Sequence, residues 1–434
     1  MLTETKDNLD YAWQMLCGLT KHVFLAGNAG TGKTTLIRKF MAAFEGKAIM
    51  LAPTGIAAVN AGGMTIHRFF HFPARPLSYS AVKWLNPDLP EDYAKRKLIE
   101  AADYIIIDEI SMVRADIMDQ VGWFFHKNFP GKPFGGKKII MVGDLDQLPP
   151  VVSTDEEREM LMTRYKSEFF FHAKVWQDYA QFETVKLTKI FRQSDPLFIG
   201  LLNNIKNGQI APFEIDNLNS KCLRYDQLSP TDGIMLCSTN KIAAEVNSYM
   251  VHGLPGDIIQ LSGKIENEFN HKNCPVDLDI NVKIGCRIMT MRNATDNSYC
   301  NGSIGTLIEH DPERCVLIIK LDNGSTIEMP KYIFENVEYK YDKEKDKISH
   351  TITGTFTQYA VRIAYALTVH KSQGQTFDKI IIDLGERGAF AHGQVYVALS
   401  RCTTMEGITL RRPIAMKDLI YNKNIQEFNK ALAI

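Results

Sequence analysis

An eight-residue segment near the N-terminus has the composition of a phosphate-binding loop. Gly27-Asn28-Ala29-Gly30-Thr31-Gly32-Lys33-Thr34 fits the pattern G-x-x-x-x-G-K-[ST], and it lies between an apolar run and a helical stretch. Glycines allow a tight turn whose backbone N–H groups surround phosphate oxygens. We expect Lys33 to contact the β- and γ-phosphates of a nucleoside triphosphate and the Thr34 hydroxyl to bind Mg²⁺. The alternative, a glycine-rich turn without a ligand, does not explain the flanking strand and helix. The predicted phosphate-binding residues are Gly27, Asn28, Ala29, Gly30, Thr31, Gly32, Lys33, Thr34 and Thr35.

Two adjacent carboxylates, Asp108 and Glu109, end a second apolar run at 104–107. At the end of a buried strand, the aspartate can hold Mg²⁺ and the glutamate can orient and deprotonate the attacking water. Carboxylates in this position can also cap a helix, and the phosphate-binding loop upstream favours the hydrolytic roles. A GTPase is disfavoured because Asn240-Lys241-Ile242-Ala243 has alanine where a base-reading aspartate would stand. A nucleotide kinase would be a much shorter chain.

The elements that must position these groups form an α/β pattern. Short apolar runs alternate with helical stretches, which is typical of a parallel sheet, and the run 104–107 is apolar throughout, as a strand covered on both faces should be. Two series of such strands predict two α/β domains that join near 189–196. The predicted strands are 22–26, 48–52, 104–108 and 138–142 in the first series, and 233–237, 364–367 and 379–384 in the second.

Two insertions interrupt this pattern. Within 283–358, alternating strands flank Asp322-Asn323-Gly324, a strong hairpin signal, and further turns are expected at Asn301-Gly302 and 341–347. The segment 69–101 is rich in proline and has no clear periodicity, so we interpret it as an insertion from the first sheet. The predicted domains are 1–190 with the insertion 69–101, 191–282 together with 359–434, and the β-rich insertion 283–358.

Composition sets limits on the class of protein. A chain of 434 residues is too long for one ordinary core, and 45% apolar with 23% charged residues is typical of a soluble globular protein. The number of lysine and arginine residues equals the number of aspartate and glutamate residues, 50 each. A polyanion would therefore have to bind in a local groove, because the chain has no net positive charge. No apolar run approaches the roughly 18 residues that span a bilayer, and the polar N-terminus does not resemble a secretory signal. Eight cysteines without a C-x-x-C pair favour reduced thiols in a cytoplasm.

Six segments stand in a recognisable order along the chain. They are Leu51-Ala52-Pro53-Thr54-Gly55-Ile56-Ala57-Ala58, Asp108-Glu109-Ile110-Ser111-Met112, Gly143-Asp144-Leu145-Asp146-Gln147-Leu148-Pro149-Pro150, Phe191-Arg192-Gln193, Thr368-Val369-His370-Lys371-Ser372-Gln373-Gly374 and Tyr396-Val397-Ala398-Leu399-Ser400-Arg401. This set resembles the superfamily 1B helicases and, among them, the Pif (petite-integration-frequency) helicases. Phe134-Gly135-Gly136 resembles the signature that separates Pif proteins from RecD-like relatives, and the whole chain resembles a compact bacterial-type core.

The resemblance implies ATP and Mg²⁺ in a cleft between two RecA-like domains. Gln147 would hydrogen-bond the γ-phosphate, and Arg192 and Arg401 would reach across the cleft to stabilise transition-state charge, an effect worth ~10³–10⁵ in rate in other NTPases. Surface salt bridges would be the usual explanation for either arginine alone. The predicted catalytic residues are Lys33, Glu109, Gln147, Arg192 and Arg401, the further nucleotide-binding residues are Gln14 (for adenine) and Gly374, and the Mg²⁺ ligands are Thr34 and Asp108.

A second group of residues is suited to hold single-stranded DNA. Hydroxyls, imidazoles and one lysine can bind a phosphate backbone without reading bases. The aromatic residues Phe69, Phe70 and Phe72 could stack on bases, although core packing is the alternative for most of them. His67 and His71 are spaced as in a zinc helix, but Arg68 stands where the glutamate should be, so no metal is predicted there. The predicted DNA-binding residues are Pro53, Thr54, Gly55, Thr65, His67, Asn240, Thr368, His370, Lys371 and Ser372.

The resemblance further implies 5′→3′ movement on single-stranded DNA and unwinding of forked or partial-duplex DNA. It suggests G-quadruplex DNA and RNA–DNA hybrids as additional substrates, in repair, recombination, replication or telomere-type maintenance. The insertion 69–101 would act as a wedge and the insertion 283–358 would be an SH3-like module. A monomer is expected, with DNA-induced dimers as an alternative. Two other functions stay open, namely a translocase that strips proteins without unwinding and a non-motor nucleotide switch with slow, DNA-independent hydrolysis.

Overall fold

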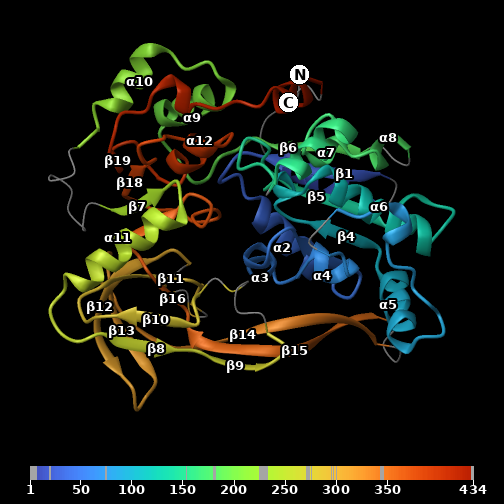
Figure 1. The fold of residues 1–434 in the computed structure, drawn as a ribbon, viewed down its shortest axis with the longest axis horizontal. Helices are drawn as coiled ribbons and strands as arrows, with labels where there is room; N and C mark the ends of the chain where they lie inside the picture. The colour runs from blue at the N-terminus through green and yellow to red at the C-terminus, as the bar shows by residue number, and fades with distance from the viewer. Residues whose placement is uncertain are drawn as a thin grey trace. The chain divides into compact units, whose positions relative to one another are not determined.

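The computed structural model (Figure 1) describes the chain except for residues 1–6, 19–20, 74–75, 153, 179–181, 224–232, 270–273, 275, 295, 297, 300, 343–346 and 432–434. The contacts divide the chain into two compact units. Unit 1 comprises Met1–Phe191, Val337–Ile352 and Lys423–Ile434, and unit 2 comprises Arg192–Asn336 and Thr353–Asn422. No helix in the described ranges has the length and apolar character needed to cross a bilayer.

Unit 1 contains a six-stranded parallel sheet with the order β3-β2-β4-β5-β1-β6. Its first four long strands coincide with the four strands predicted for the first series, which confirms that part of the α/β assignment. Every residue of β2, β4 and β5 is buried, as expected for a sheet covered on both faces. The strands are β1 His22–Gly27, β2 Ala48–Ala52, β3 Met64–Thr65, β4 Tyr104–Ile107, β5 Lys138–Gly143 and β6 Phe182–Leu187.

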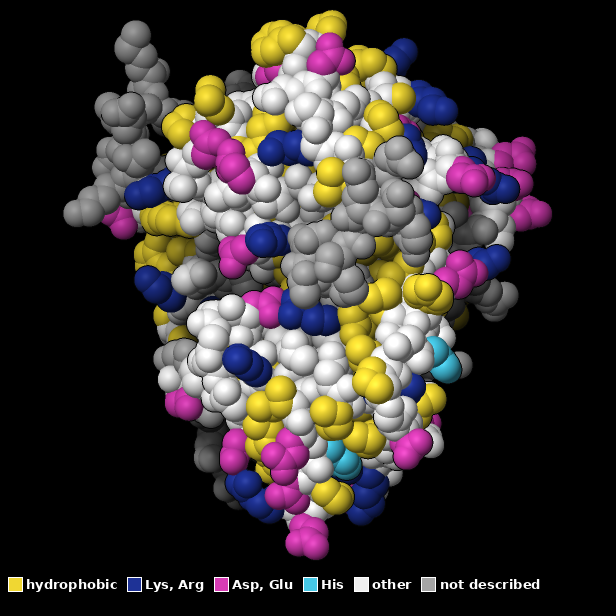
Figure 2. Space-filling model, turned by 90° about the vertical axis from the view of Figure 1, so that its left-hand side faces the viewer, with side chains coloured by type: hydrophobic (Ala, Val, Ile, Leu, Met, Phe, Trp, Pro, Cys, Tyr) yellow, Lys and Arg dark blue, Asp and Glu magenta, His cyan; other side chains and the backbone are white. Residues whose placement is uncertain are grey.

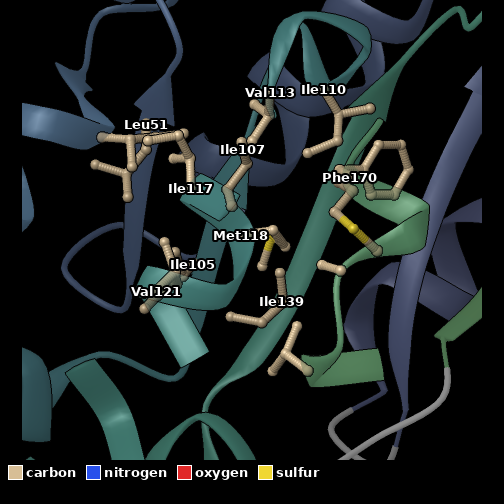
Figure 3. Close-up of a cluster of buried hydrophobic side chains, with 14 of the residues drawn as sticks. Leu51, Ile105, Ile107, Ile110, Val113, Ile117, Met118, Val121, Ile139 and Phe170 are labelled. Atoms are coloured by element: carbon tan, nitrogen blue, oxygen red, sulfur yellow. The ribbon is translucent and has the colours of Figure 1, made fainter. Parts of the chain in front are cut away.

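Helices cover the two faces of this sheet because successive side chains of a strand point to opposite sides. Ile105 and Ile107 of β4 pack against Met118 on α6, as Figure 3 shows. Ile106, between them, points to the other face and joins the cluster that contains Phe40 of α2. The helices of unit 1 are α1 Asp7–Cys17, α2 Lys33–Ala43, α3 Gly55–Ala61, α4 Ile66–Phe70, α5 Pro90–Ala101, α6 Ala115–Asn128, α7 Asp155–Tyr165, α8 Val175–Asp178 and α13 Lys423–Ala431.

The last helix, α13, packs in unit 1 although the sequence analysis assigned it, within 359–434, to the second α/β domain. Phe428 stacks on Phe171 with ring centroids 4.1 Å apart, and Ile425 is fully buried. These contacts join residues more than 250 positions apart in the sequence. The sequence pattern alone places a C-terminal helix in the domain that precedes it. Only the packing shows that α13 belongs to unit 1.

The segment 69–101 is more regular than predicted. Its last 12 residues form α5, which starts with Pro90 at a favoured helical position and carries Glu91 and Asp92 in its first turn. Phe69, Phe70 and Phe72 are buried in the core of unit 1, so the core-packing alternative holds for these three rings.

Unit 2 contains a second parallel sheet, with the order β17-β7-β18-β19. Three of its strands overlap the predicted second series, and β19 was not predicted. Together the two parallel sheets confirm the α/β class. The strands are β7 Ile234–Cys237, β17 Ala366–Thr368, β18 Ile380–Asp383 and β19 Ile408–Leu410, and the helices are α9 Pro196–Asn207, α10 Pro212–Asn219, α11 Asn240–His252 and α12 Gln394–Leu399.

An antiparallel module interrupts this second sheet. Its seven-stranded sheet has the order β16-β11-β12-β13-β14-β15-β9, and β8 pairs with β10 in a separate two-stranded sheet. The predicted Asp322-Asn323-Gly324 turn joins β13 to β14, with Lys320 opposite Thr326. The strands are β8 Ile259–Ser262, β9 Lys264–Asn267, β10 Asp279–Val282, β11 Arg287–Thr290, β12 Ile304–Asp311, β13 Val316–Leu321, β14 Thr326–Asp342, β15 Lys347–Tyr359 and β16 Val361–Ile363.

The antiparallel strands therefore run from 259 to 363, whereas the sequence predicted the insertion at 283–358. Strands β8 and β9 were missed because they are short and mostly exposed, without a clear apolar alternation. The predicted turn at 341–347 lies largely outside the described residues. Near it, Tyr339 of β14 packs in unit 1, where its buried hydroxyl accepts a hydrogen bond from the Met50 N–H at 3.1 Å.

Candidate active site and DNA-binding residues

The phosphate-binding loop lies between β1 and α2, as predicted. A Cβ on Gly27 would come within 2.6 Å of the Thr31 Oγ1 and 3.1 Å of the Leu187 carbonyl oxygen, so only glycine fits where the strand enters the loop. The Lys33 ammonium donates to the Gly27 carbonyl at 2.6 Å and to the Asn28 carbonyl at 3.0 Å. The cation therefore lies directly against the loop whose N–H groups would bind phosphate.

The predicted carboxylates follow β4, two strands away from β1 in the same parallel sheet. Burial raises the pKa of Asp108, and the nearby Lys33 and Arg38 cations counteract part of that increase. The Asp108 Oδ1 accepts from the Glu109 N–H at 2.9 Å, and Glu109 has a left-handed backbone with φ 49°. Non-glycine residues in this conformation are concentrated at functional sites, and here it fixes the direction in which the glutamate leaves the strand.

The end of β5 packs against the turn that carries Asp108 and Glu109. A Cβ on Gly143 would lie 2.9 Å from the Ile110 Cγ2, so glycine is what allows the two strand ends to approach. The carboxylate of Asp144 then organises the next turn, accepting from the Gln147 Nε2 at 3.1 Å and from the Asp146 N–H at 3.2 Å. Asp144 is therefore a turn residue, and it holds the buried Gln147 side chain.

Lys33, Asp108, Glu109 and Gln147 thus all follow carboxyl ends of strands in one sheet of unit 1. Such an edge is where α/β proteins bind ligands, because the loops there carry helix N-termini and strand-end side chains together. The residue set fits a Mg²⁺–nucleotide: a cation and a glycine loop for phosphates, and a hydroxyl with a carboxylate for the metal. Gln14 is exposed on α1, and its role toward adenine stays a prediction.

In unit 2, the two predicted arginines converge on one turn after α12. The Arg192 guanidinium donates to the Ser400 carbonyl at 3.3 Å, and the fully buried Arg401 donates to the Val397 carbonyl at 3.0 Å and to the Ser400 Oγ at 3.0 Å. Burial lowers the pKa of Arg192. Residues that are 209 positions apart are thereby held in one network.

Gln193 completes this network, a role that its sequence motif does not indicate. Its Nε2 donates to the Ser400 carbonyl at 3.0 Å and to the Cys402 carbonyl at 2.8 Å. The Phe191-Arg192-Gln193 motif marked the position, but only the contact shows that the glutamine positions the turn that carries Arg401.

The predicted DNA-binding residues of unit 1 lie beyond β2 and β3, which pair side by side through Ala52 and Thr65. Thr54 caps α3 by accepting from the Ala57 N–H, and Thr65 caps α4 by accepting from the Arg68 N–H, each at 3.2 Å. Both hydroxyls therefore have a structural role at the helix starts. Burial lowers the pKa of His67, which follows Thr65 on α4.

Three of the predicted DNA-binding residues of unit 2 line one cavity of about 460 Å³, namely Asn240, Thr368 and Lys371. Arg362 of β16 also lines it and is 8% exposed, a residue that no sequence motif marked. Asp277 lies in the same wall. Burial, followed by the Arg362 charge, lowers the pKa of Lys371, and Asp277 opposes that decrease.

The remaining predicted DNA contacts in unit 2 differ in their accessibility. His370 is half-buried, and burial lowers its pKa. Ser372 is fully buried and its hydroxyl donates to the Val369 carbonyl at 2.8 Å, so in this structure it stabilises the turn after β17. The nearby Asn247 has a structural role, because its amide hydrogen-bonds both the N–H and the carbonyl of Ala366 at 2.8 Å.

Comparison with known proteins adds independent information. The model of the PIF1-like helicase family matches residues 9–214. The chain is 31% identical over 401 residues to the ATP-dependent DNA helicase Pif1 of Campylobacter jejuni, covering 88% of this chain and 87% of that protein. The structure of Bacteroides sp Pif1 in complex with ADP-AlF4 matches with a TM-score of 0.90 at 35% identity, over 100% of this chain and 98% of that one. Bacteroides Pif1 bound to ssDNA matches with a TM-score of 0.69 at 35% identity, over 99% and 97% of the two chains.

Proposed function

The chain belongs to the PIF1-like helicase family, and we propose that it uses ATP hydrolysis to move 5′→3′ along single-stranded DNA and to unwind duplex DNA. The observation that carries this proposal is the set of Lys33, Asp108, Glu109 and Gln147 at the carboxyl ends of one parallel sheet. Similarity to Pif1 proteins over nearly the whole chain supports the motor function beyond simple hydrolysis.

At the hydrolytic site, each residue of unit 1 has a distinct task. Lys33 and the loop N–H groups bind the β- and γ-phosphates, and Thr34 with Asp108 holds Mg²⁺, which neutralises phosphate charge. Glu109 accepts the proton of the attacking water, and Gln147 hydrogen-bonds the γ-phosphate. Asp144 and Gly143 support this geometry indirectly.

We assign Arg192 and Arg401 to the transition-state charge on the γ-phosphate. Both guanidinium groups are hydrogen-bonded to Ser400, so a movement of the Ser400 turn would displace both of them. Hydrolysis would therefore be coupled to closing and opening of two RecA-like domains around the nucleotide. Gln193 acts as a positioning residue for this pair.

The DNA track proposed here combines Pro53, Thr54, Gly55, Thr65 and His67 of unit 1 with unit 2 residues. On the face drawn in Figure 2, lysine and arginine side chains are scattered among acidic and apolar ones, so the described residues form no broad basic surface on that side. Local polar and charged side chains, such as those that line the Lys371 cavity, would therefore bind the phosphate backbone of the DNA. The residues of unit 2 are Asn240, Thr368, His370 and Lys371, with Ser372 as a support.

The parts around this core would assist unwinding. We interpret the segment 69–101 as a wedge that parts the strands, and the antiparallel strands between β8 and β16 as an SH3-like module beside the DNA. Forked and partial-duplex DNA are the proposed substrates, with G-quadruplex DNA and RNA–DNA hybrids as further ones, in genome maintenance by a monomer. The free cysteines of the described residues suit a reducing cytoplasm.

The proposed activity and polarity are tested by strand displacement from two matched partial duplexes, one with a 5′ tail and one with a 3′ tail. With ATP and Mg²⁺, we expect only the 5′-tailed duplex to open. Opening of the 3′-tailed duplex alone would reverse the polarity. If neither duplex opens while DNA still stimulates ATP hydrolysis, the chain is a translocase without unwinding activity.

Binding of single-stranded DNA should weaken steeply with salt, because lysine–phosphate contacts release counterions. We expect Lys371→Ala to reduce the slope of log Kd against log salt concentration by about 0.7, the value for one phosphate contact on a single strand. Fluorescence anisotropy of a labelled oligonucleotide at several salt concentrations measures this slope. The exposed Lys417 provides the control substitution, and equal slopes for both variants would remove Lys371 from the track.

A further inference from the structure

A tryptophan on the segment 69–101 projects from an otherwise fixed loop. Trp84 is 51% exposed, whereas Val82 and Leu85 on either side are buried in the core of unit 1. Trp84 is the one tryptophan among the exposed large apolar side chains of the described residues. An exposed indole presents a large flat ring, the kind of surface on which a base can stack.

Helix α6 fixes the loop from one side. The Asn128 side chain accepts from the Leu85 N–H at 2.7 Å and donates to the Lys83 carbonyl at 3.1 Å. Lys127 donates to the Val82 carbonyl at 2.7 Å. The backbone on both sides of Trp84 is therefore bonded to one helix.

Helix α5 fixes the loop from the other side through Asp92, which is 3% exposed. One Asp92 oxygen pairs with the Lys83 ammonium at 2.6 Å, and the other accepts from the Asn86 N–H at 3.0 Å. The loop thus has polar anchors before and after Trp84. Such anchoring fixes the backbone from which the indole projects, as a binding residue on a rigid support requires.

We propose that Trp84 stacks on the terminal base pair of the duplex at a DNA fork, which makes it the strand-separating contact of the segment 69–101. This inference rests on the proposed helicase function. The loop begins directly after α4, which carries the proposed DNA contact His67, and the Phe72 N–H donates back to the His67 carbonyl at 2.8 Å. DNA track and loop are therefore joined within unit 1.

The charges of residues 79–101, which form the loop and α5, cancel, and this favours a base-pair face over a phosphate backbone as the ligand of the indole. Residues 79–101 contain four cations and four anions, so their net charge is zero. A neutral support with a projecting indole can stack on a base without binding the phosphate backbone of the DNA. Binding of the phosphate backbone at this position would oppose movement along the strand. The cations are Lys83, Lys95, Arg96 and Lys97, and the anions are Asp88, Glu91, Asp92 and Glu100.

The test compares Trp84→Ala, Trp84→Phe and a control, Phe213→Ala, in the full chain. Phe213 is an exposed aromatic residue on α10 of unit 2. We expect Trp84→Ala to slow displacement of a 5′-tailed duplex about tenfold, since one base stack is lost. DNA-stimulated ATP hydrolysis and affinity for single-stranded DNA should change less than about twofold. Trp84→Phe should retain most of the displacement rate, and Phe213→Ala all of it.

A binding measurement complements the rates. With 2-aminopurine in the first base pair of the fork, wild type and Trp84→Phe should quench its fluorescence more than Trp84→Ala does, and the same probe within the single-stranded tail should report no difference. A normal displacement rate for Trp84→Ala overturns the inference and leaves a protein partner as the ligand of the indole. A parallel loss of single-strand affinity also overturns it, since Trp84 would then belong to the track. If the wild type opens neither tailed duplex, the helicase function itself fails and this inference fails with it.

Discussion

Replacement of Lys33 by alanine is expected to lower DNA-stimulated ATP hydrolysis by at least about 100-fold, the usual cost of removing one group that stabilises transition-state charge. The Lys33 ammonium lies against the Gly27 and Asn28 carbonyls of the loop, where phosphate oxygens would bind. Without it, the γ-phosphate loses its cation contact, and affinity for ATP should fall together with the rate. Phosphate release with saturating single-stranded DNA measures the rate.

The matched control for this experiment is Lys39→Ala. Lys39 lies on the same helix, α2, and is exposed, so its removal tests the effect of losing one charge from that helix. We expect the control variant to hydrolyse ATP at the wild-type rate. Because Lys33 is not part of the hydrophobic core, both variants should melt near the wild-type temperature. Hydrolysis by Lys33→Ala that is still stimulated by DNA would contradict the assignment of the nucleotide site.

The hydrolytic residues of unit 1 could be predicted because short contiguous segments encode them. A buried parallel strand is an apolar run of four to six residues, and its end is where the chain becomes polar, so Asp108 could be located by position. Gln147, four residues beyond the end of β5, was located by the family resemblance of its motif. The predicted strand 48–52 agrees with β2 at both ends for the same reason.

Other features were not predictable because they depend on contacts between distant residues. Helix α13 has an ordinary amphipathic sequence, and its place in unit 1 follows from the stacking of Phe428 on Phe171. Gln193 follows an arginine in a recognisable motif, yet its task depends on Ser400. Arg362 stands in a three-residue strand without any motif, and only the cavity reveals it.

Local irregularity explains the errors at the insertions. Helix α5 was missed because charged residues, among them Lys95, Arg96 and Lys97, leave it few apolar positions, and of its apolar side chains only Leu98 and Ile99 are buried. The left-handed backbone of Glu109 could not be predicted either, since the surrounding fold maintains it against its intrinsic cost.

Glu109→Gln is expected to separate ATP binding from ATP hydrolysis. The amide has the size and shape of the carboxylate, so the strained turn at φ 49° should persist, but a glutamine cannot accept the proton of the attacking water. Turnover should fall by about 10²–10⁴, the range that a general base contributes. Affinity for ATP should stay within about twofold of wild type, because Lys33 and the loop still bind the phosphates.

Two measurements on this variant distinguish a general base from a structural residue. Equilibrium binding of a fluorescent ATP analogue reports the nucleotide site, and single-turnover hydrolysis reports the chemical step. Glu45→Gln, an exposed substitution outside the site, should leave both unchanged. A normal hydrolysis rate for Glu109→Gln would assign the proton transfer to another group. A loss of ATP binding equal to that of Lys33→Ala would instead mean that Glu109 holds the loop in place. Retained binding with lost turnover is therefore the combination expected if Glu109 acts on the attacking water and does not hold the nucleotide.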